Sequence, residues 1–385
     1  MFETYLRNSN ELDYNYRIKK SIIKRPKYKW KLPIQYHISK RLQVSVIKQA
    51  IKVVEEETCV TFNESTKNIR KVRGVNFKMD YYICGSLVGM RKKEKPQSIL
   101  LTVDCSKNFG GVLHEIFHTL GLYHEQSRRD RKKFVKIIKR NVYPDYRFNF
   151  AKNPIHNAQN FGISYDLGSL MHYDLKALGY GEATVVPLDQ NYNNTIGQHN
   201  NYTFNDIKLV NYFYCNQTCN STTPRLECKN YGYQDPRNCS RCKCPHGFAG
   251  DTCENLKPQS NTTLCGDQTI NATSNEKVLT RTGIMECTYQ INTNSTKKLK
   301  ITVQNMTANP APNPEEHLYC FQKMALEIKH REDKSITGLN ICGDAKVPIN
   351  VTSEGNSTII LWYGKHENHS FNLTYQEIQD EKQNS

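Results

Sequence analysis

The segment HEIFHTLGLYHE, which begins at His114, constrains the fold of this chain more than any other part of its sequence. His114 and His118 are four residues apart, so on an α-helix their imidazoles lie one turn apart on one face and can reach a single ion. Gly121 permits the positive φ that ends such a helix, which lets the chain turn back and bring His124 to the same ion. The segment therefore predicts a helix that stops at a glycine, with three histidines around one metal.

The chemistry of this segment indicates a catalytic zinc ion rather than a structural one. Three histidine ligands leave one coordination position open, whereas structural zinc sites have four protein ligands. Glu115 lies beside the ligand face, where its carboxylate can take a proton from a zinc-bound water and pass it to a leaving amine. We therefore expect one zinc ion per chain, with Glu115 as general base and then general acid.

Chance is a poor explanation of this motif. With 12 His and 20 Gly in 385 residues, the pattern H-E-x-x-H-x-x-G-x-x-H is expected in on the order of 1 chain in 10⁴ to 10⁵. The apolar residues between the ligands are those of a core helix: Val112, Leu113, Ile116, Phe117 and Leu120.

The zinc motif and the segment SLMHY (residues 169–173) make the chain resemble the astacin family of zinc endopeptidases, within the metzincins. The resemblance implies that Met171 lies in a tight turn beneath the zinc. It also implies that Tyr173 is a weak extra ligand that swings off the ion and donates a hydrogen bond to the oxyanion, since a phenol can ligate or donate. Glu125, directly after the third histidine, is implied to be buried beside the ammonium group of the mature N-terminus.

The fold implied by this resemblance is α+β, with a two-lobed protease domain at residues 21–216. Its N-terminal lobe has a twisted sheet and two helices, its C-terminal lobe is irregular, and the cleft runs across the zinc helix. The segment WKLPIQY, which starts at Trp30, resembles the first strand of the family's mature domain. Residues 44–57 are predicted as the first long helix, because their apolar side chains form one stripe.

Residues 1–20 are interpreted as a propeptide remnant or an N-terminal extension. Mature family members begin where Ser21 stands, and RIKK (residues 17–20) resembles a dibasic cleavage signal, although a solvated basic patch is the alternative. Asp13 lacks the context of the family's aspartate switch, and no apolar run typical of a signal peptide is present. We expect a zymogen whose chain, as given, is incomplete at its N-terminus.

The 14 cysteines are an even number and cluster as in the disulfide frameworks of exported proteins. In the protease region the resemblance implies the pairs Cys59–Cys215 and Cys84–Cys105. The next six cysteines resemble an EGF-like module at residues 217–256, with the expected pairs Cys219–Cys239, Cys228–Cys242 and Cys244–Cys253. A zinc knuckle is the alternative for four residues of this module: Cys239, Cys242, Cys244 and His246.

Residues 257–376 resemble a CUB domain, which is a β-sandwich, and residues 377–385 are interpreted as a polar tail. The four cysteines match the rhythm of that family, which implies the pairs Cys265–Cys287 and Cys320–Cys342. Runs of alternating hydrophobicity, such as residues 299–303 and 358–363, predict its strands. Many CUB domains bind calcium through acidic side chains, whereas the sequence after Cys320 is FQKM, which argues against a calcium site here.

The sequence also indicates export. No stretch approaches the apolar length of a membrane span, so we expect a secreted, extracellular glycoprotein without a transmembrane segment. Asn238, which has a cysteine inside its sequon, is the weakest glycan site. The N-x-S/T sequons lie at Asn63, Asn193, Asn201, Asn216, Asn220, Asn238, Asn261, Asn271, Asn294, Asn305, Asn350, Asn356, Asn368 and Asn372.

The net charge of +16 is compatible with an acidic partner. Nucleic acid is not expected, because Lys and Arg are spread through the chain and no nucleic-acid motif accompanies them. Extracellular-matrix or acidic-glycan contacts, made through the basic surface and the CUB domain, are expected beside the protein or peptide substrates.

These patterns predict a secreted zinc endopeptidase that hydrolyses internal peptide bonds of extracellular or matrix proteins through a metal-activated water. Two other readings stay open. An inactive binding protein with a vestigial protease fold is opposed by the intact ligands, Glu115, Met171 and Tyr173. A narrow processing enzyme is not distinguished from a broad digestive one, because subsite residues cannot be placed from sequence.

Overall fold

The structure is a computed structural model that describes residues 22–24, 26–152, 158–219, 226–308, 319–345 and 348–380. The chain forms two compact units, each described below by itself. The first comprises Met1–Gln190 and Ile196–Thr223, and the second comprises Asn191–Thr195 and Pro224–Ser385. The interpretation of residues 1–20, the sequon at Asn220 and the last residues of the expected polar tail fall outside the described residues. Within the described ranges, no helix has the length and apolarity that a membrane span requires.

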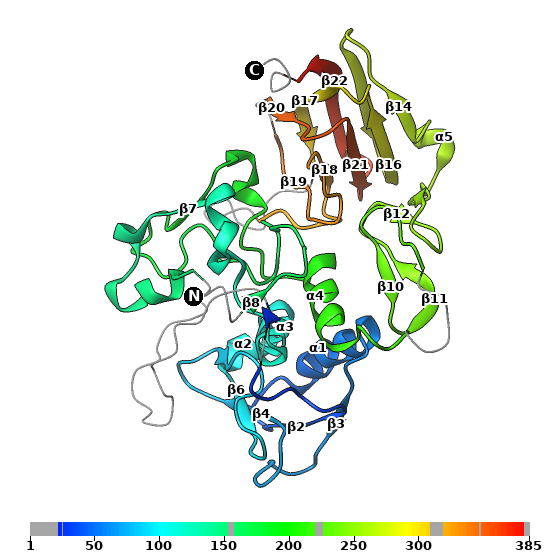
Figure 1. Ribbon diagram of the computed structural model, residues 1–385. Coiled ribbons are helices and arrows are strands. Elements are labelled where there is room, and N and C mark those ends of the chain that lie inside the picture. Colours follow the sequence, from blue (N-terminus) through cyan, green and yellow to red (C-terminus); the bar gives the residue numbers. More distant parts are fainter. Residues whose placement is uncertain are drawn as a thin grey trace. The chain divides into compact units, whose positions relative to one another are not determined.

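A five-stranded sheet forms one end of the first unit (Figure 1). Its order is β3-β2-β4-β6-β5, and all neighbours are parallel except β5, which runs antiparallel to β6 at the edge. Buried and half-buried residues alternate along β2 and β6, as expected for strands that cover a core. The strands are β2 (Ile34–Ile38), β3 (Phe62–Glu64), β4 (Val75–Met79), β5 (Gly85–Ser86) and β6 (Gln97–Leu101).

Two long helices pack together in the core of this unit, α1 (Val44–Glu57) and α3 (Phe109–Leu120). α1 buries the predicted stripe, including Ile47, Ile51 and Val54. Between β6 and α3 lies α2 (Val103–Lys107), and the side chain of Asn108 caps α3 by accepting a hydrogen bond from Gly111 N–H at 2.7 Å. Most of α3 is buried on all sides, which fits its apolar sequence and fixes its orientation.

The rest of the first unit is mainly irregular. Its last helix, α4 (Phe204–Tyr214), begins with a capping box in which Thr203 and Asp206 satisfy each other's backbone N–H. The expected α+β fold, with a sheet-and-helix half and an irregular half, is confirmed. The short elements are β1 (Ile22–Ile23), η1 (Glu125–Ser127), η2 (Arg129–Lys133), β7 (Val135–Ile137), η3 (Lys139–Asn141), η4 (Pro144–Phe150), β8 (Ala158–Gln159) and β9 (Val185–Pro187), of which β1 pairs with β8 and β7 with β9. A further 3-10 helix, η5 (Gln190–Asn194), starts at the last residue of this stretch of the first unit and lies mostly in the second.

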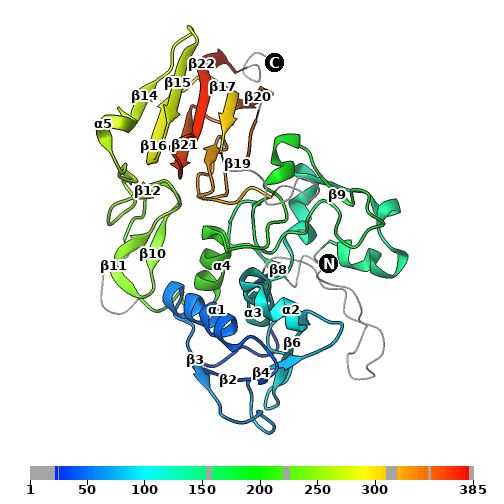
Figure 2. The same cartoon turned by 180° about the vertical axis from the view of Figure 1, so that it is seen from behind.

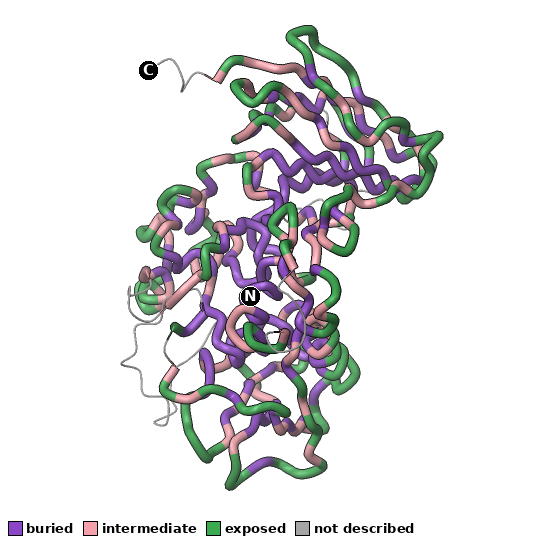
Figure 3. Tube along the Cα trace, turned by 45° about the vertical axis from the view of Figure 1, so that its right-hand side comes forward, coloured by how far each residue is buried: buried purple, intermediate pink, exposed green. Residues whose placement is uncertain are grey.

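The second unit contains a sandwich of two antiparallel-rich sheets, seen from behind in Figure 2. Buried residues run along its strands (Figure 3) and include Tyr289, Trp362 and Phe371. One sheet has the order β14-β16-β21-β18-β19: β14 (Thr269–Asn271), β16 (Met285–Asn292), β21 (Ser357–Gly364), β18 (Leu326–Lys329) and β19 (Leu339–Ile341). The other has the order β15-β22-β17-β20: β15 (Lys277–Thr282), β22 (Ser370–Gln379), β17 (Lys297–Thr307) and β20 (Ile349–Thr352).

A small hairpin-rich module precedes this sandwich, followed by a short helix, α5 (Thr262–Cys265). The strands of the module are β10 (Tyr233–Asp235), β11 (Asn238–Lys243), β12 (Phe248–Ala249) and β13 (Asn255–Leu256). Its Cys239, Cys242 and Cys244 are all disulfide-bonded, and Nδ1 of His246 lies 2.8 Å from Oε2 of Glu327. The alternative of a zinc knuckle is therefore wrong, because its sulfurs are consumed in disulfides.

One disulfide links distant parts of the first unit, and several others cross-link the second unit internally. The structure joins Cys59 with Cys215 across 156 residues, at the C-terminal ends of α1 and α4. Cys219 and Cys239 are also disulfide-bonded, and none of the described cysteines is free. The other pairs are Cys84–Cys105, Cys228–Cys242, Cys244–Cys253, Cys265–Cys287 and Cys320–Cys342.

The segment Asn191–Thr195 is packed inside the second unit, although it lies far from the rest of that unit in sequence. Tyr192 is 2% exposed, and its hydroxyl lies 3.2 Å from Nε2 of His330. The N–H of Asn340 donates to the hydroxyl of Thr195 at 3.0 Å, and the N–H of Cys320 donates to the carbonyl of Asn194 at 2.7 Å.

A buried carboxylate joins the small module to the sandwich within the second unit. Glu327 on β18 is 1% exposed and accepts hydrogen bonds from His246, from the side chain of Gln322 at 2.9 Å and from Gly338 N–H at 2.8 Å. The other ring nitrogen of His246 meets the hydroxyl of Tyr363 on β21. Burial lowers the pKa of His246, so the neutral ring donates to Glu327 and accepts from Tyr363.

The protonation of Glu327 is therefore coupled to folding. Burial alone would raise its pKa, but the ammonium group of Lys329 and the hydrogen bonds around the carboxylate lower the pKa to about 2. A carboxyl group whose folded pKa is depressed stabilises the fold above its unfolded pKa. That stability is lost as pH falls through the folded pKa.

We predict that ionised Glu327 contributes on the order of 3 kcal/mol to the stability of the second unit, that this contribution is lost between about pH 4.5 and pH 2, and that Glu327→Gln reduces the pH dependence by that amount. Trp362 reports on the second unit alone once Trp30 is replaced by Phe, because the chain has two tryptophans. Urea unfolding followed by its fluorescence measures the effect. Glu286→Gln, at an exposed carboxylate paired with Lys257, is the matched control, and an equal pH slope in the parent and in Glu327→Gln would contradict the prediction.

Candidate metal centre and active site

Three imidazoles of the first unit converge on one point. Nε2 of His124 lies 3.3 Å from Nε2 of His114 and 3.1 Å from Nε2 of His118. Their ligand atoms all lie within 4.8 Å of one another, and no other group of three or more metal-binding side chains occurs in the described ranges. This spacing suits one ion bound by three nitrogen atoms.

Backbone carbonyls orient two of these rings. Nδ1 of His114 lies 2.9 Å from the carbonyl oxygen of Leu170, and Nδ1 of His118 lies 2.7 Å from that of Leu122. A carbonyl can only accept, so each Nδ1 carries the proton and each Nε2 presents a lone pair to the centre. Burial, reinforced by His118 and His124, lowers the pKa of His114 and keeps it in the neutral form that a metal needs.

The third ligand depends on a reversal of the chain at Gly121. Gly121 ends α3 in the left-handed region with φ of 111°, and its N–H bonds back to the carbonyls of Phe117 and His118. Leu122 N–H donates to the carbonyl of Phe117 at 2.9 Å, which completes the helix cap. Two residues later the chain has turned back far enough for His124 to face the other two rings.

Glu115 and Tyr173 lie at the same site. Glu115 follows the first ligand on α3 and is 4% exposed, and its carbonyl accepts a hydrogen bond from Ser86 on β5 at 2.8 Å. The ring of Tyr173 lies 4.5 Å from the ring of His124 and 5.4 Å from that of Phe150. Glu115 is thus adjacent in sequence to the ligand His114, and the ring of Tyr173 packs against that of the ligand His124.

A turn through Met171 adjoins the metal ligands, because the carbonyl of the preceding Leu170 lies 2.9 Å from Nδ1 of His114. Met171 is fully buried, its carbonyl accepts from Glu125 N–H at 2.9 Å, and its own N–H donates to the hydroxyl of Ser169 at 3.1 Å. His172 N–H donates back to the carbonyl of Ser169 at 3.0 Å, which closes a β-turn. The segment from the third histidine is thereby tied to this turn.

Asp206 anchors that turn, and sequence reasoning did not single it out. Its carboxylate accepts hydrogen bonds from the hydroxyl of Ser169 at 2.6 Å and from Leu170 N–H at 3.1 Å, besides those from Thr203. The signal for its capping role was present in the sequence as a Thr-x-x-Asp pattern before an apolar run. The contact with Leu170 was not readable, because it joins residues 36 positions apart.

Glu125 is paired with an arginine in the structure. Its Oε1 accepts from Nη1 of Arg128 at 3.0 Å and from Asp166 N–H at 3.1 Å. Arg128 also holds Asp130 with two hydrogen bonds, at 2.9 and 2.8 Å. Burial alone would lower the pKa of Arg128, but the two carboxylates outweigh burial and raise it. The ammonium group expected beside Glu125 belongs to Ser21, which lies outside the described residues.

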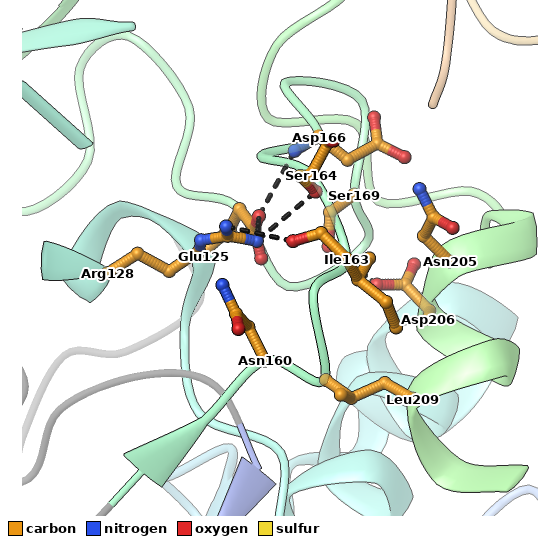
Figure 4. Close-up of a pocket in the computed structure, with 10 residues that line it drawn as sticks. All are labelled: Glu125, Arg128, Asn160, Ile163, Ser164, Asp166, Ser169, Asn205, Asp206 and Leu209. Atoms are coloured by element: carbon orange, nitrogen blue, oxygen red, sulfur yellow. Dashed lines mark hydrogen bonds and ion pairs between the residues drawn. The ribbon is translucent and has the colours of Figure 1, made fainter. Parts of the chain in front are cut away.

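A small pocket with a volume of about 20 Å³ adjoins this ion pair (Figure 4). The side chain of Asn205 lines it and is 4% exposed, and neither its oxygen nor its nitrogen has a hydrogen-bond partner among the described residues. Asn160, on the opposite side in Figure 4, directly follows β8, which pairs with β1. The cavity is lined by Glu125, Arg128, Asn160, Ile163, Ser164, Asp166, Ser169, Asn205, Asp206 and Leu209.

Comparisons with known proteins agree with this geometry. The Astacin family of peptidases matches residues 22–215. Zinc metalloproteinase nas-34 of Caenorhabditis elegans is 32% identical over 362 residues, which is 93% of this chain and 57% of that protein. Zinc metalloproteinase nas-37 of the same organism is 33% identical over 328 residues, which is 83% of this chain and 39% of that protein. The chain thus spans about half the length of these curated relatives.

A solved structure is also similar. High choriolytic enzyme 1, a hatching enzyme zinc-protease from Oryzias latipes, shares 29% sequence identity with a TM-score of 0.43, over 48% of this chain and 94% of that chain.

We predict that Gly121→Ala weakens zinc binding at least tenfold, because an alanine at φ of 111° is strained by about 1 kcal/mol or more and relaxes by moving His124. Gly181→Ala is the matched control, since Gly181 also has a positive φ, of 93°, and open space around it. Competition with a chelating dye measures zinc affinity. Equal zinc affinity in the two variants would mean that the turn does not set the third ligand.

Proposed function

The chain belongs to the astacin family of zinc peptidases, and from this premise we propose that it is a secreted endopeptidase that hydrolyses internal peptide bonds of extracellular or matrix proteins. The observation that carries the activity is the convergence of His114, His118 and His124 beside Glu115. These three buried imidazoles fit one zinc ion per chain, because they offer neutral nitrogen donors and leave a coordination position open.

Each residue of the site has one proposed role in the reaction. When bound, the zinc ion supplies Lewis-acid polarisation of the scissile carbonyl and lowers the pKa of the attacking water. Glu115 accepts the proton of that water at its carboxylate and returns it to the leaving nitrogen. Tyr173 donates its phenolic O–H to the oxygen that gains negative charge, and its position against the ring of His124 supports this role. Met171 packs beneath the ligands and holds their supporting turn.

Activation by removal of the residues before Ser21 is also proposed. Ile22 is fully buried, bridges to Leu122 beside the zinc helix, and belongs to β1. A new ammonium group at residue 21 would then enter the region of Glu125 and the adjoining cavity, whose acidic lining favours a cation. The side chain of Asn205 offers an acceptor there without a described partner.

An extracellular location is supported by the disulfides and by the exposure of the sequons. Disulfides in such number persist in oxidising compartments. Most sequon asparagines in the described ranges are exposed and can carry a glycan. They are Asn63, Asn201, Asn216, Asn238, Asn261, Asn271, Asn294, Asn305, Asn350, Asn356 and Asn368.

We predict that Glu115→Gln lowers kcat on a quenched peptide by about 10³-fold or more, because it removes the proton acceptor, while zinc content stays at that of the parent. Inductively coupled plasma mass spectrometry gives the zinc content. Glu94→Gln, at an exposed residue paired with Arg73, is the matched control. Turnover by Glu115→Gln near that of the parent would refute the assigned role.

A proteome-derived peptide library, digested with the activated chain and mapped by mass spectrometry, tests the proposed function as a whole. We expect cuts within peptides rather than at their ends, and we expect a chelator and Glu115→Gln each to abolish them. Cleavage at few sequences would indicate a processing enzyme, and cleavage at many sequences would indicate a digestive enzyme. An absence of zinc-dependent cuts would favour the binding-protein alternative.

A further inference from the structure

Three tyrosines form an aromatic cluster in the first unit, here termed the tyrosine platform: the exposed Tyr143 and Tyr180 and the half-buried Tyr146. The ring centroids of Tyr143 and Tyr180 are 4.0 Å apart, and those of Tyr143 and Tyr146 are 6.3 Å apart. Tyr143 is 39% exposed and Tyr180 is 57% exposed. Contiguous aromatic surface left open to water indicates a binding site.

The backbone beneath the platform is fixed. Val142 forms an antiparallel bridge with Gly179, Tyr143 N–H donates to the carbonyl of Leu178 at 3.0 Å, and Tyr180 N–H donates to that of Asn141 at 3.2 Å. The two segments approach so closely that a Cβ atom on Gly179 would lie 2.8 Å from the carbonyl oxygen of Asn141. A ligand that covers the rings therefore pays little conformational entropy to order them.

The segment that carries Tyr143 and Tyr146 is rich in cations. Residues 129–152 contain nine Lys or Arg and two Asp, which gives 7 of the chain's net charge of +16. This stretch of the first unit lies around β7 (Figure 1). Nε of Arg147 donates to the carbonyl of Val142 at 3.4 Å, which places the guanidinium beside the platform. Most of these cations are exposed, including Lys132, Lys136, Lys139, Arg140 and Arg147.

The negative charges in this stretch do little to neutralise it. The carboxylate of Asp130 accepts two hydrogen bonds from Arg128, which lies outside the stretch and is shared with Glu125, so the charge of Asp130 is partly neutralised. The pKa of Lys152 is lowered, first by burial and then by Arg131, Lys132 and Arg129, so these like charges lie close together. Expelling small anions from such a surface favours a polyanion in their place.

We propose that the tyrosine platform and the exposed cations of residues 129–152 bind a sulfated glycosaminoglycan chain. Sulfates pair with the guanidinium and ammonium groups, while the apolar faces of sugar rings pack on the tyrosines and their hydroxyls meet the phenols. The proposal rests on the extracellular location proposed above, where such chains occur and nucleic acid does not. It gives the enzyme a way to be held in a matrix that contains its substrates.

Binding of the full chain to a heparin dodecasaccharide, measured by calorimetry in 0.15 M NaCl, tests this site. We expect Tyr143→Ala/Tyr180→Ala and Arg140→Ala/Arg147→Ala each to weaken binding at least tenfold. The matched controls are Tyr81→Ala/Tyr82→Ala, at a second exposed tyrosine pair of the first unit, and Lys92→Ala/Lys93→Ala, at exposed lysines elsewhere. Both controls are expected to stay within twofold of the parent.

Three results would overturn the proposal. Unchanged affinity of the tyrosine variant would exclude the platform, and Tyr180→Ser alone decides this if the double variant unfolds early. An equal loss in the lysine control would mean diffuse electrostatic attraction. Equal binding of the desulfated dodecasaccharide would exclude sulfate recognition. We expect the zinc-stripped chain to bind heparin as tightly as the parent does. We also expect the tyrosine variant to cleave a short peptide at the parent's rate. These two measurements separate failure of this site from failure of the peptidase proposal.

Discussion

The metal centre depends on the reversal of the chain at Gly121. A helix alone presents His114 and His118 on one face, but the third imidazole reaches them only because the backbone enters the left-handed region at that glycine. The same turn supplies the carbonyl of Leu122 that orients His118, and its own carbonyl accepts from Ile23 N–H at 3.2 Å. One backbone conformation at Gly121 therefore ends α3, orients the ligands His118 and His124, and gives β1 a hydrogen-bond acceptor.

The part of the first unit that follows the third histidine orients the metal-binding imidazoles and supplies none of the three. Leu170 donates its N–H to the carboxylate of Asp206, and its carbonyl accepts from His114. A capping box at the start of α4 is thus connected through one residue to a metal ligand. The carbonyl of Met171 in the same turn also accepts a hydrogen bond from Glu125 N–H. Backbone hydrogen bonds therefore join this turn to the segment that directly follows the third histidine.

The features that could be predicted from sequence are those set by residues close together in the chain. The helix at residues 44–57, the α+β class and the family follow from periodicity and from motifs within a few residues of each other. The hydrogen-bond partners of Glu125 and Leu170 were not predictable from sequence. Arg128 and Asp206 are two among many charged residues, and only the tertiary fold determines which of these contacts Glu125 or Leu170. Lys and Arg are not evenly spread, because residues 129–152 combine a strong positive charge with Tyr143 and Tyr146, and the third ring of the platform, Tyr180, is distant in sequence.

The packing of Asn191–Thr195 inside the second unit bears on how such a protein can evolve. A protein module can be exchanged between genes as an independent unit only if it carries its whole core. Here Tyr192, a core residue of the second unit, is encoded more than thirty residues before the rest of that unit begins at Pro224. Replacing the sandwich by one from another protein would leave Tyr192 and Thr195 without His330 and Asn340. The two units are therefore expected to be inherited together, with residues 191–195 changing in step with the sandwich.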